Sequence, residues 1–186
     1  VAVLSGGNVD PLLLGKLIRH GLTHTGRYLH LRVIIPDRPG GLARLLMENP
    51  GATILAGGTD VGLWVTKQLR QLGPIISVGE VAELKNITVN DRWIEIGAAV
   101  TYTDAMATLE AHYPDMADMI RRLGSEQIRN AGTIGGNIAN GSPIGDTPPP
   151  LIALGARLTL RRGKKRRTIL LEDYFFAFGK QDRQPG

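Results

Sequence analysis

Apolar and polar positions along this chain follow two different periods, and each period predicts one kind of element. Apolar residues that recur every three or four positions indicate a helix, as at residues 11–20, where Pro11 takes the first position after Asp10. Apolar residues that alternate with polar ones indicate a strand, as in YLHLRVII at residues 28–35. The same patterns predict helices at 42–48, 60–71, 103–111 and 114–123, and strands at 1–4, 53–56, 75–78 and 93–100.

Residues 53–78 have the most regular succession of elements. A strand, a glycine turn, the helix at 60–71 and a second strand follow one another, which is the order of a βαβ unit. The later strand at 93–100 is expected to pair with residues near 87–89 in a hairpin. The chain therefore combines helices with strands of both orientations.

The last third of the chain contains a long segment of unusual composition and a hairpin. Residues 131–150 are rich in Gly, Asn, Ser and Pro, and we predict an ordered loop there rather than a linker. In the hairpin Leu158 and Leu160 face inward, residues 163–164 form the turn, and residues 169–171 return.

The composition narrows the class of protein. With 186 residues, 42% of them hydrophobic, the chain is long enough for one core or two small domains. It has neither an apolar stretch of the ~20 residues that span a bilayer nor the pattern of a secretory signal, so we expect no membrane contact. Cysteine is absent, which excludes disulfides, thiolate metal sites and cysteine-ligated iron–sulfur clusters in this chain. A reducing compartment fits this composition, and we expect a cytoplasmic protein.

The positive net charge comes from one short segment. Seven of the 22 basic residues lie in the segment from Arg157 to Arg167. The rest of the chain has 15 basic and 17 acidic residues, which gives it a net charge of −2. Nucleic-acid binding by this segment is one interpretation, although no aromatic residues alternate with the charges as a stacking surface would need. The other is that Arg and Lys occupy the solvent face of the hairpin.

The first candidate for chemistry is LAGGTDVG at residues 55–62, which we call the first glycine segment. Glycines between a strand and a helix leave backbone N–H groups accessible at the positive end of the helix, and such a turn binds anions. The alternative is a tight turn with Thr59 or Asp60 as the helix cap. The segment matches neither GxGxxG nor a Walker A loop, so the residues alone leave both interpretations open.

The second candidate is NAGTIGGNIANGSPIGD at residues 130–146, the second glycine segment. Its glycines permit close backbone approach, and Thr133, Asn137, Ser142 and Asp146 offer directed hydrogen bonds. A flavin nucleotide needs both, whereas a purely structural loop would use Asn and Asp to cap its own backbone. Two such segments in one chain favour one ligand held between them.

Other constellations offer little chemistry. The four histidines are scattered, and His20 with His24 would flank Gly21 at a helix end, so we predict no metal site. No Ser/His/Asp arrangement and no acid–base pair stands out.

Five segments of the chain resemble, in order, the FAD-binding domain of the xanthine dehydrogenase family, as found in the bacterial small subunit. The resemblance runs from about residue 38 to the end. The segments are ATILAGGTDVGLWVTKQLR, PIISVGEVAELK, IEIGAAVTYTDA, RRLGSEQIRNAGTIGGNIANGSPIGDTPPPLIALGA and LRRGKKRRTILLEDYFF.

The resemblance implies an α+β fold, a two-subdomain FAD-binding domain of the PCMH type, with FAD in the crevice between the subdomains. It implies that the first glycine segment holds the pyrophosphate and that the second contacts the flavin and its tail. The residues at the matching positions are Ala56, Gly57, Gly58, Thr59, Asp60 and Val61 in the first segment and Thr133, Gly136, Asn137 and Asp146 in the second.

The chain also departs from this family. The family's small subunit carries cysteine-rich iron–sulfur modules before this domain, and no cysteine is present here. The chain is expected to lack the domain's last strand and the C-terminal domain that follows it. A lysine from that later region that approaches the flavin has no counterpart in this sequence.

The N-terminal residues resemble a different family. Residues 3–10 and 27–40 are similar to the end of the pyridoxal-phosphate domain and the start of the ACT domain of threonine dehydratase. Ser5 matches the serine that bonds the cofactor's pyridine nitrogen, but the Schiff-base lysine and the phosphate loop have no match. We therefore expect an extra N-terminal helix–strand segment of this type at 1–40 and a C-terminally truncated FAD-binding domain of the molybdopterin dehydrogenase type at 41–186.

The leading hypothesis is the FAD-binding module of a xanthine dehydrogenase-like oxidoreductase. In such an enzyme, electrons pass from iron–sulfur clusters through FAD to NAD, with iron–sulfur and molybdopterin domains or subunits as partners. The chain alone is not expected to oxidise a purine, and at most weak diaphorase-like activity is expected. The alternative is a chimeric, non-catalytic binding protein that uses the basic hairpin. A third interpretation is an amino-acid-sensing ACT module, although only the first strand and part of one helix of that domain are present.

Overall fold

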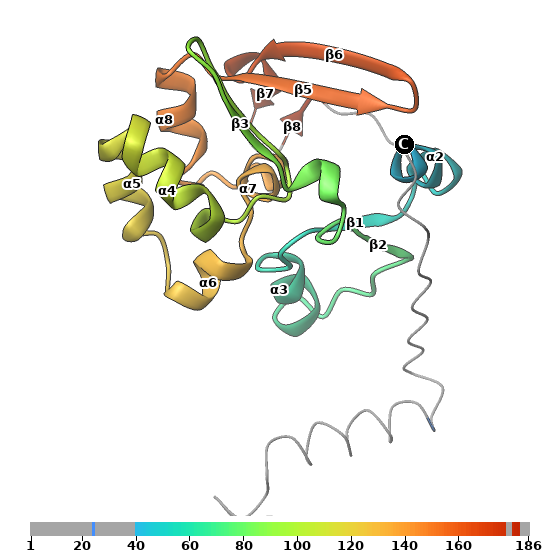
Figure 1. Ribbon diagram of the computed structural model, residues 1–186. Helices are drawn as coiled ribbons and strands as arrows, with labels where there is room; N and C mark the ends of the chain where they lie inside the picture. The colour runs from blue at the N-terminus through green and yellow to red at the C-terminus, as the bar shows by residue number, and fades with distance from the viewer. Residues whose placement is uncertain (1–23, 25–39, 178–179, 183–186) are drawn as a thin grey trace, which may run out of the picture. The chain divides into compact units, whose positions relative to one another are not determined.

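The computed structural model describes His24, residues 40–177 and residues 180–182 (Figure 1). The chain divides into two compact units, Val1–Pro36 and Asp37–Gly186, and the second is described below. The predicted strands at 1–4 and 28–35 and the predicted helix at 11–20 lie outside the described residues.

The first elements of residues 40–177 are a short helix and a parallel pair of short strands. Helix α2 (Gly41–Glu48) precedes β1 (Thr53–Leu55), and α3 (Val61–Thr66) connects β1 to β2 (Ile75–Ser77). Strands β1 and β2 are parallel, with Ile54 opposite Ile76. The predicted βαβ unit is confirmed.

Helix α3 is shorter than the predicted helix at 60–71. The Thr66 hydroxyl donates to the Gly62 carbonyl oxygen at 2.9 Å, a local bond that disfavours continuation of a helix. Leu69 has a left-handed φ of 53°, so the helical conformation has ended by that residue. Its side chain is 82% exposed, and no packing stabilises a further turn.

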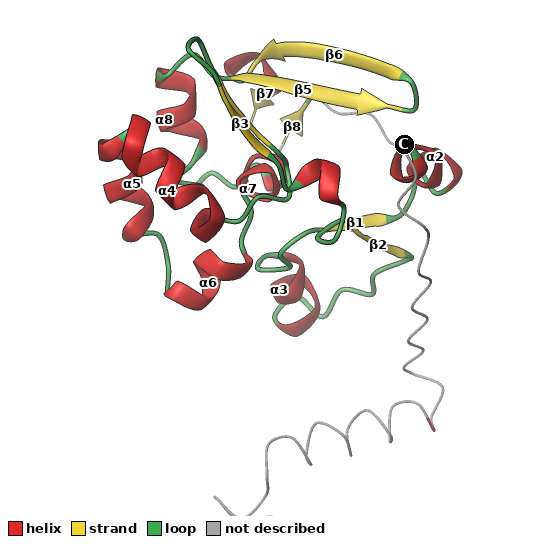
Figure 2. Cartoon of the chain, in the orientation of Figure 1, coloured by secondary structure: helices red, strands yellow, loops and turns green. Residues whose placement is uncertain are grey.

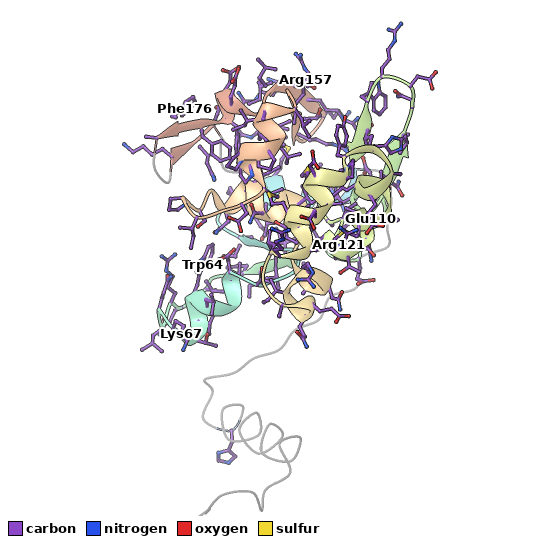
Figure 3. All side chains as sticks on the ribbon, turned by 90° about the vertical axis from the view of Figure 1, so that its left-hand side faces the viewer. Trp64, Lys67, Glu110, Arg121, Arg157 and Phe176 are labelled. Carbon is purple, nitrogen blue, oxygen red and sulfur yellow. The ribbon has the colours of Figure 1, made fainter. Side chains whose placement is uncertain are left out.

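A hairpin and two packed helices follow. After a 3₁₀ turn, η1 (Ala82–Leu84), strands β3 (Ile87–Val89) and β4 (Ile94–Ile96) pair in antiparallel fashion, as predicted. The strand predicted at 93–100 is too long, because β4 ends at Ile96 and residues 98–99 form a turn. Helices α4 (Tyr102–His112) and α5 (Pro114–Arg121) agree with the two predicted helices. An ion pair between Glu110 and Arg121, 2.5 Å apart, links α4 to α5 (Figure 3).

The segment predicted as a loop at 131–150 contains helices, so that prediction is wrong. After α6 (Glu126–Ala131) come α7 (Ile134–Asn140) and α8 (Pro148–Ala153). Helix α7 forms because the Thr133 Oγ1 caps it, accepting a hydrogen bond from the Gly136 N–H at 3.0 Å. Ile134 and Ile138, one turn apart, anchor α7 by burying their side chains. The high glycine content of this segment obscured the helical spacing of Ile134 and Ile138 in the sequence.

The predicted basic hairpin is confirmed. Strands β5 (Arg157–Arg162) and β6 (Lys165–Leu170) pair in antiparallel fashion and appear as the two long yellow arrows of Figure 2. Leu158 and Leu160 are half-buried and pack against the core, as expected. A turn, η2 (Glu172–Tyr174), leads to β7 (Phe175–Ala177) and β8 (Lys180–Gln181).

Several cations of this hairpin are paired within the chain. Glu83 of η1 contacts Arg161 at 3.2 Å and Arg166 at 3.5 Å. Asp182 contacts Arg167 at 2.7 Å. The basic segment therefore ties the hairpin to η1 and to the residue after β8, in addition to facing solvent.

The hydrophobic core is built mainly from α4, α5 and α7. In α4 and α5 the buried residues lie on one face of the helix, the apolar face that the sequence pattern predicts, whereas the two buried residues of α7 were not predicted. The buried cluster consists of Val100, Tyr102, Ala105, Leu109, Met116, Ala117, Ile120, Ile134, Ile138, Leu171 and Tyr174. The second glycine segment is therefore fixed to the core through α7.

Within the part of the chain that the structure describes, no helix has the length and apolar character needed to cross a membrane.

Candidate functional site

The two glycine segments, far apart in the sequence, are in contact. A Cβ atom added to Gly57 would overlap the carbonyl oxygen of Ala131 and lie 3.1 Å from the backbone nitrogen of Gly132. Only a residue without a side chain permits two backbones to approach so closely. The structure thus brings together the two segments that the sequence singled out, as a ligand shared between them requires.

Backbone donors of the first glycine segment are unused. In the described part of the chain, the N–H groups of residues 57–60 donate to no other group, and the first that does is that of Gly62, to the Gly58 carbonyl at 2.8 Å. Asp60 takes the N-cap position of α3, but its side chain accepts no capping hydrogen bond. The alternative in which Asp60 serves as the cap is therefore not observed. Consecutive free N–H groups suit an anionic ligand.

Thr133 and Gly136 form the cap of α7. Thr133 is 5% exposed, and its Oγ1 already accepts the Gly136 N–H. A Cβ atom on Gly136 would lie 2.6 Å from that oxygen, so Gly136 has no room for a side chain. Both residues hold the start of α7 in shape, and the Thr133 hydroxyl proton remains available for an acceptor.

The most direct indication of a ligand at this site comes from the Asn137 side chain. Its Oδ1 is buried and has no hydrogen-bond partner among the described residues. Leaving a buried acceptor unsatisfied costs about 1–3 kcal/mol. A donor on a bound molecule would satisfy this oxygen, and the Asn137 side chain therefore fits a ligand-binding role better than the structural alternative of backbone capping.

Two of the predicted site residues, Asp60 and Asp146, raise the pKa of a buried hydroxyl, that of Tyr102. Burial raises the pKa of Tyr102, the Thr147 hydrogen bond lowers it, and the charges of Asp146 and Asp60 raise it further. Asp60 belongs to the first glycine segment and Asp146 to the second, so both segments contribute negative charge near this point. Both Tyr102 and Thr147 are absent from the residues predicted from sequence. The only signal was a tyrosine beside the apolar residues 98–100, where a buried hydroxyl needs a partner.

A separate hollow of about 440 Å³ lies between the α4–α5 turn and α8. Its lining is mostly apolar and includes His112, Tyr113, Met116, Met119 and Leu154. None of the predicted site residues lines it. Among the described residues, no group of three or more His, Asp or Glu could hold a metal ion.

The comparison with protein families decides the assignment. The sequence pattern of the family described as "FAD binding domain in molybdopterin dehydrogenase" matches residues 29–186. The chain belongs to this family. FAD is the cofactor of the family, and the resemblance deduced from the two glycine segments is confirmed.

Known relatives agree with this assignment. The xanthine dehydrogenase FAD-binding subunit of Escherichia coli O157:H7 is 32% identical over 139 residues, which cover 73% of this chain and 48% of that protein. The nicotinate dehydrogenase FAD-subunit of Eubacterium barkeri is 32% identical over 145 residues, covering 77% of this chain and 49% of that protein. The chain spans about half the length of these relatives.

Solved structures confirm the α+β fold. CO dehydrogenase from Oligotropha carboxidovorans matches with a TM-score of 0.74 and 27% identity, over 81% of this chain and 54% of that chain. Quinoline 2-oxidoreductase from Pseudomonas putida 86 matches with a TM-score of 0.75 and 20% identity, over 84% of this chain and 57% of that chain, and shows likeness of fold alone. The predicted segment boundary at residues 40–41 and the threonine dehydratase resemblance of residues 1–40 stay predictions.

Proposed function

We propose that this chain binds FAD between its two glycine segments, as the flavin module of a molybdenum-dependent hydroxylase. The observation that carries the proposal is the contact between Gly57 and the Ala131–Gly132 backbone. This contact joins the segment with free N–H groups to the segment that contains the hydrogen-bonding side chains.

The residues present fit the cofactor. The backbone of residues 56–61 would hold the pyrophosphate, because the N–H groups of residues 57–60 make no bond within the described part of the chain. Thr133, Gly136, Asn137 and Asp146 would line the flavin and its ribityl and ribose hydroxyls. Asn137 supports this most strongly, since its buried Oδ1 would accept a hydrogen bond from a hydroxyl or imide N–H.

The chemistry that bound FAD supplies is electron transfer, and in the whole enzyme we propose that it runs from iron–sulfur clusters to NAD. The protein's own residues position and orient the cofactor and exclude water from it. Partner domains or subunits with iron–sulfur and molybdopterin centres are part of this proposal. Relatives named as FAD subunits support the presence of other subunits, and the family description names molybdopterin. We also propose a cytoplasmic location, which cell fractionation tests.

Replacement of Asn137 tests the site. We expect Asn137→Ala to weaken FAD binding about tenfold, the effect of losing one buried hydrogen bond worth about 1–1.5 kcal/mol. Folding should not suffer, because Asn137 Oδ1 has no partner among the described residues. The measurement is titration of the full chain with FAD, followed by flavin fluorescence.

The matched control is Asn140→Ala, the same change at the end of the same helix. This variant should bind FAD like the wild type. Equal FAD affinity of Asn137→Ala and wild type would remove Asn137 from the site.

A further inference from the structure

Two hydroxyl groups pair in the interior beside the second glycine segment. The Tyr102 and Thr147 hydroxyl oxygens are 2.7 Å apart. Tyr102 is 2% exposed and Thr147 is fully buried. Neither hydroxyl can exchange its partner for water, so removing one leaves the other buried and unsatisfied.

Tyr102 holds both ends of the segment that carries the proposed flavin contacts. Its backbone N–H donates to the Gly132 carbonyl at 3.1 Å, and its ring lies so near Gly132 that an added Cβ would be 3.3 Å from Cε2. Its side chain reaches Thr147 at the other end. Between these two points lie Thr133, Gly136, Asn137 and Asp146. Tyr102 therefore contacts both ends of this stretch, Gly132 and Thr147, and fixes the distance between them.

The position of Asp146 depends on this closure. Asp146 is exposed, and within the described part of the chain its side chain forms no hydrogen bond or ion pair. Its backbone is continuous with Thr147, which is immobilised by burial and by Tyr102.

We propose that the Tyr102–Thr147 hydrogen bond positions Asp146 and the rest of the second glycine segment for FAD. Tyr102 is then a positioning residue, which acts through the loop and not by touching the cofactor. This inference rests on the proposed function. It adds two residues that the sequence patterns did not indicate.

Four variants of the full chain test the inference by FAD titration. Tyr102→Phe and Thr147→Val each remove one hydroxyl and should each weaken FAD binding roughly tenfold. The double variant should bind no more weakly than either single variant, because both changes remove the same bond. Thr147→Ser keeps the hydroxyl and should bind FAD nearly as well as the wild type.

Tyr174→Phe is the matched control, because Tyr174 is also 2% exposed and lies outside the second glycine segment. It should keep wild-type FAD affinity. A merely structural role of Tyr102 would lower the melting temperature and leave the FAD affinity of the folded variant unchanged, which overturns the inference. If Tyr102→Phe does not fold, the comparison of Thr147→Ser with Thr147→Val decides, and equal FAD affinities of these two overturn the inference.

The failure of the proposed function would be recognised separately. If the folded wild-type chain does not bind FAD at all, the proposed function fails and this inference fails with it. If the wild type binds FAD and the hydroxyl variants bind equally well, only the inference fails.

Discussion

At the residue scale, the Tyr102 hydroxyl is held between a buried partner and two carboxylates. Burial, together with the charges of Asp146 and Asp60, raises its pKa above the ordinary value of 10.0. The unfolded chain therefore releases this proton near pH 10, whereas the folded chain retains it to higher pH. Unfolding is favoured by proton release as the pH rises above 10, so the stability contributed by this group is present below pH 10 and is lost above it.

A spectrophotometric titration of tyrosinate between pH 8 and 12 checks this pKa. The Tyr102 hydroxyl should ionise above pH 10. Subtracting the titration curve of Tyr102→Phe from that of the wild type should isolate it. If the difference curve has its midpoint at or below pH 10, the hydroxyl is not buried as described.

Gly57 gives a second prediction at this scale. In Gly57→Ala the new methyl group meets the Ala131 carbonyl, and backbone cannot move aside as a flexible side chain can. We expect a loss of about 1–3 kcal/mol in the free energy of unfolding, the usual range for overpacking, and weaker FAD binding. Urea denaturation and FAD titration measure the two effects.

Gly62→Ala is the control for Gly57→Ala. No atom lies within 4 Å of a Cβ added to Gly62, which is in helix α3. Alanine is the better helix former, so this variant should be neutral or up to about 1 kcal/mol more stable. If both variants behave alike, the two glycine segments are not in contact in solution.

The sequence indicated the glycines of the proposed site but not Tyr102 and Thr147, which pair beside it. Gly57 and Gly58 could be singled out because a glycine pair between a strand and a helix is typical of an anion-binding turn or of a tight turn. Tyr102 and Thr147 could not, because their pairing depends on two segments that come together only in the folded chain. Local patterns contain no information about such a contact.

At the scale of elements, α7 determines the shape of the second glycine segment. Its first turn depends on the Thr133 cap, and we expect Thr133→Ala to cost about 1 kcal/mol of stability and to weaken FAD binding. Ser125→Ala removes the cap of α6, whose bond to the Ile128 N–H is longer at 3.4 Å, and should cost less. Thermal unfolding followed by circular dichroism gives both values. If the two losses of stability are equal, Thr133 is not the stronger cap.

Elements with a strong apolar pattern were predictable, and those with a weak one were not. The βαβ unit, the helices α4 and α5, and the β5–β6 hairpin agree with the sequence prediction. Helix α7 was missed because glycine and asparagine disfavour helices, while a cap and the pair Ile134 and Ile138 stabilise this one. Helix α3 was predicted too long because apolar spacing continued to Leu69, which does not pack.

At the scale of the whole molecule, the chain corresponds to about half of its known relatives. The described part contains both glycine segments in contact, and the family match extends over residues 29–186. The proposal assigns FAD binding to these two segments. Electron transfer to NAD requires centres that the proposal assigns to partner domains or subunits.

The most direct test of this account is the absorbance spectrum of the purified full chain, followed by titration with FAD if the protein is colourless. We expect flavin bands near ~370 and ~450 nm, or saturable binding of added FAD at one site per chain. A chain that circular dichroism shows to be folded, but that carries no flavin and binds no added FAD, would contradict the assignment of the two glycine segments as a cofactor site.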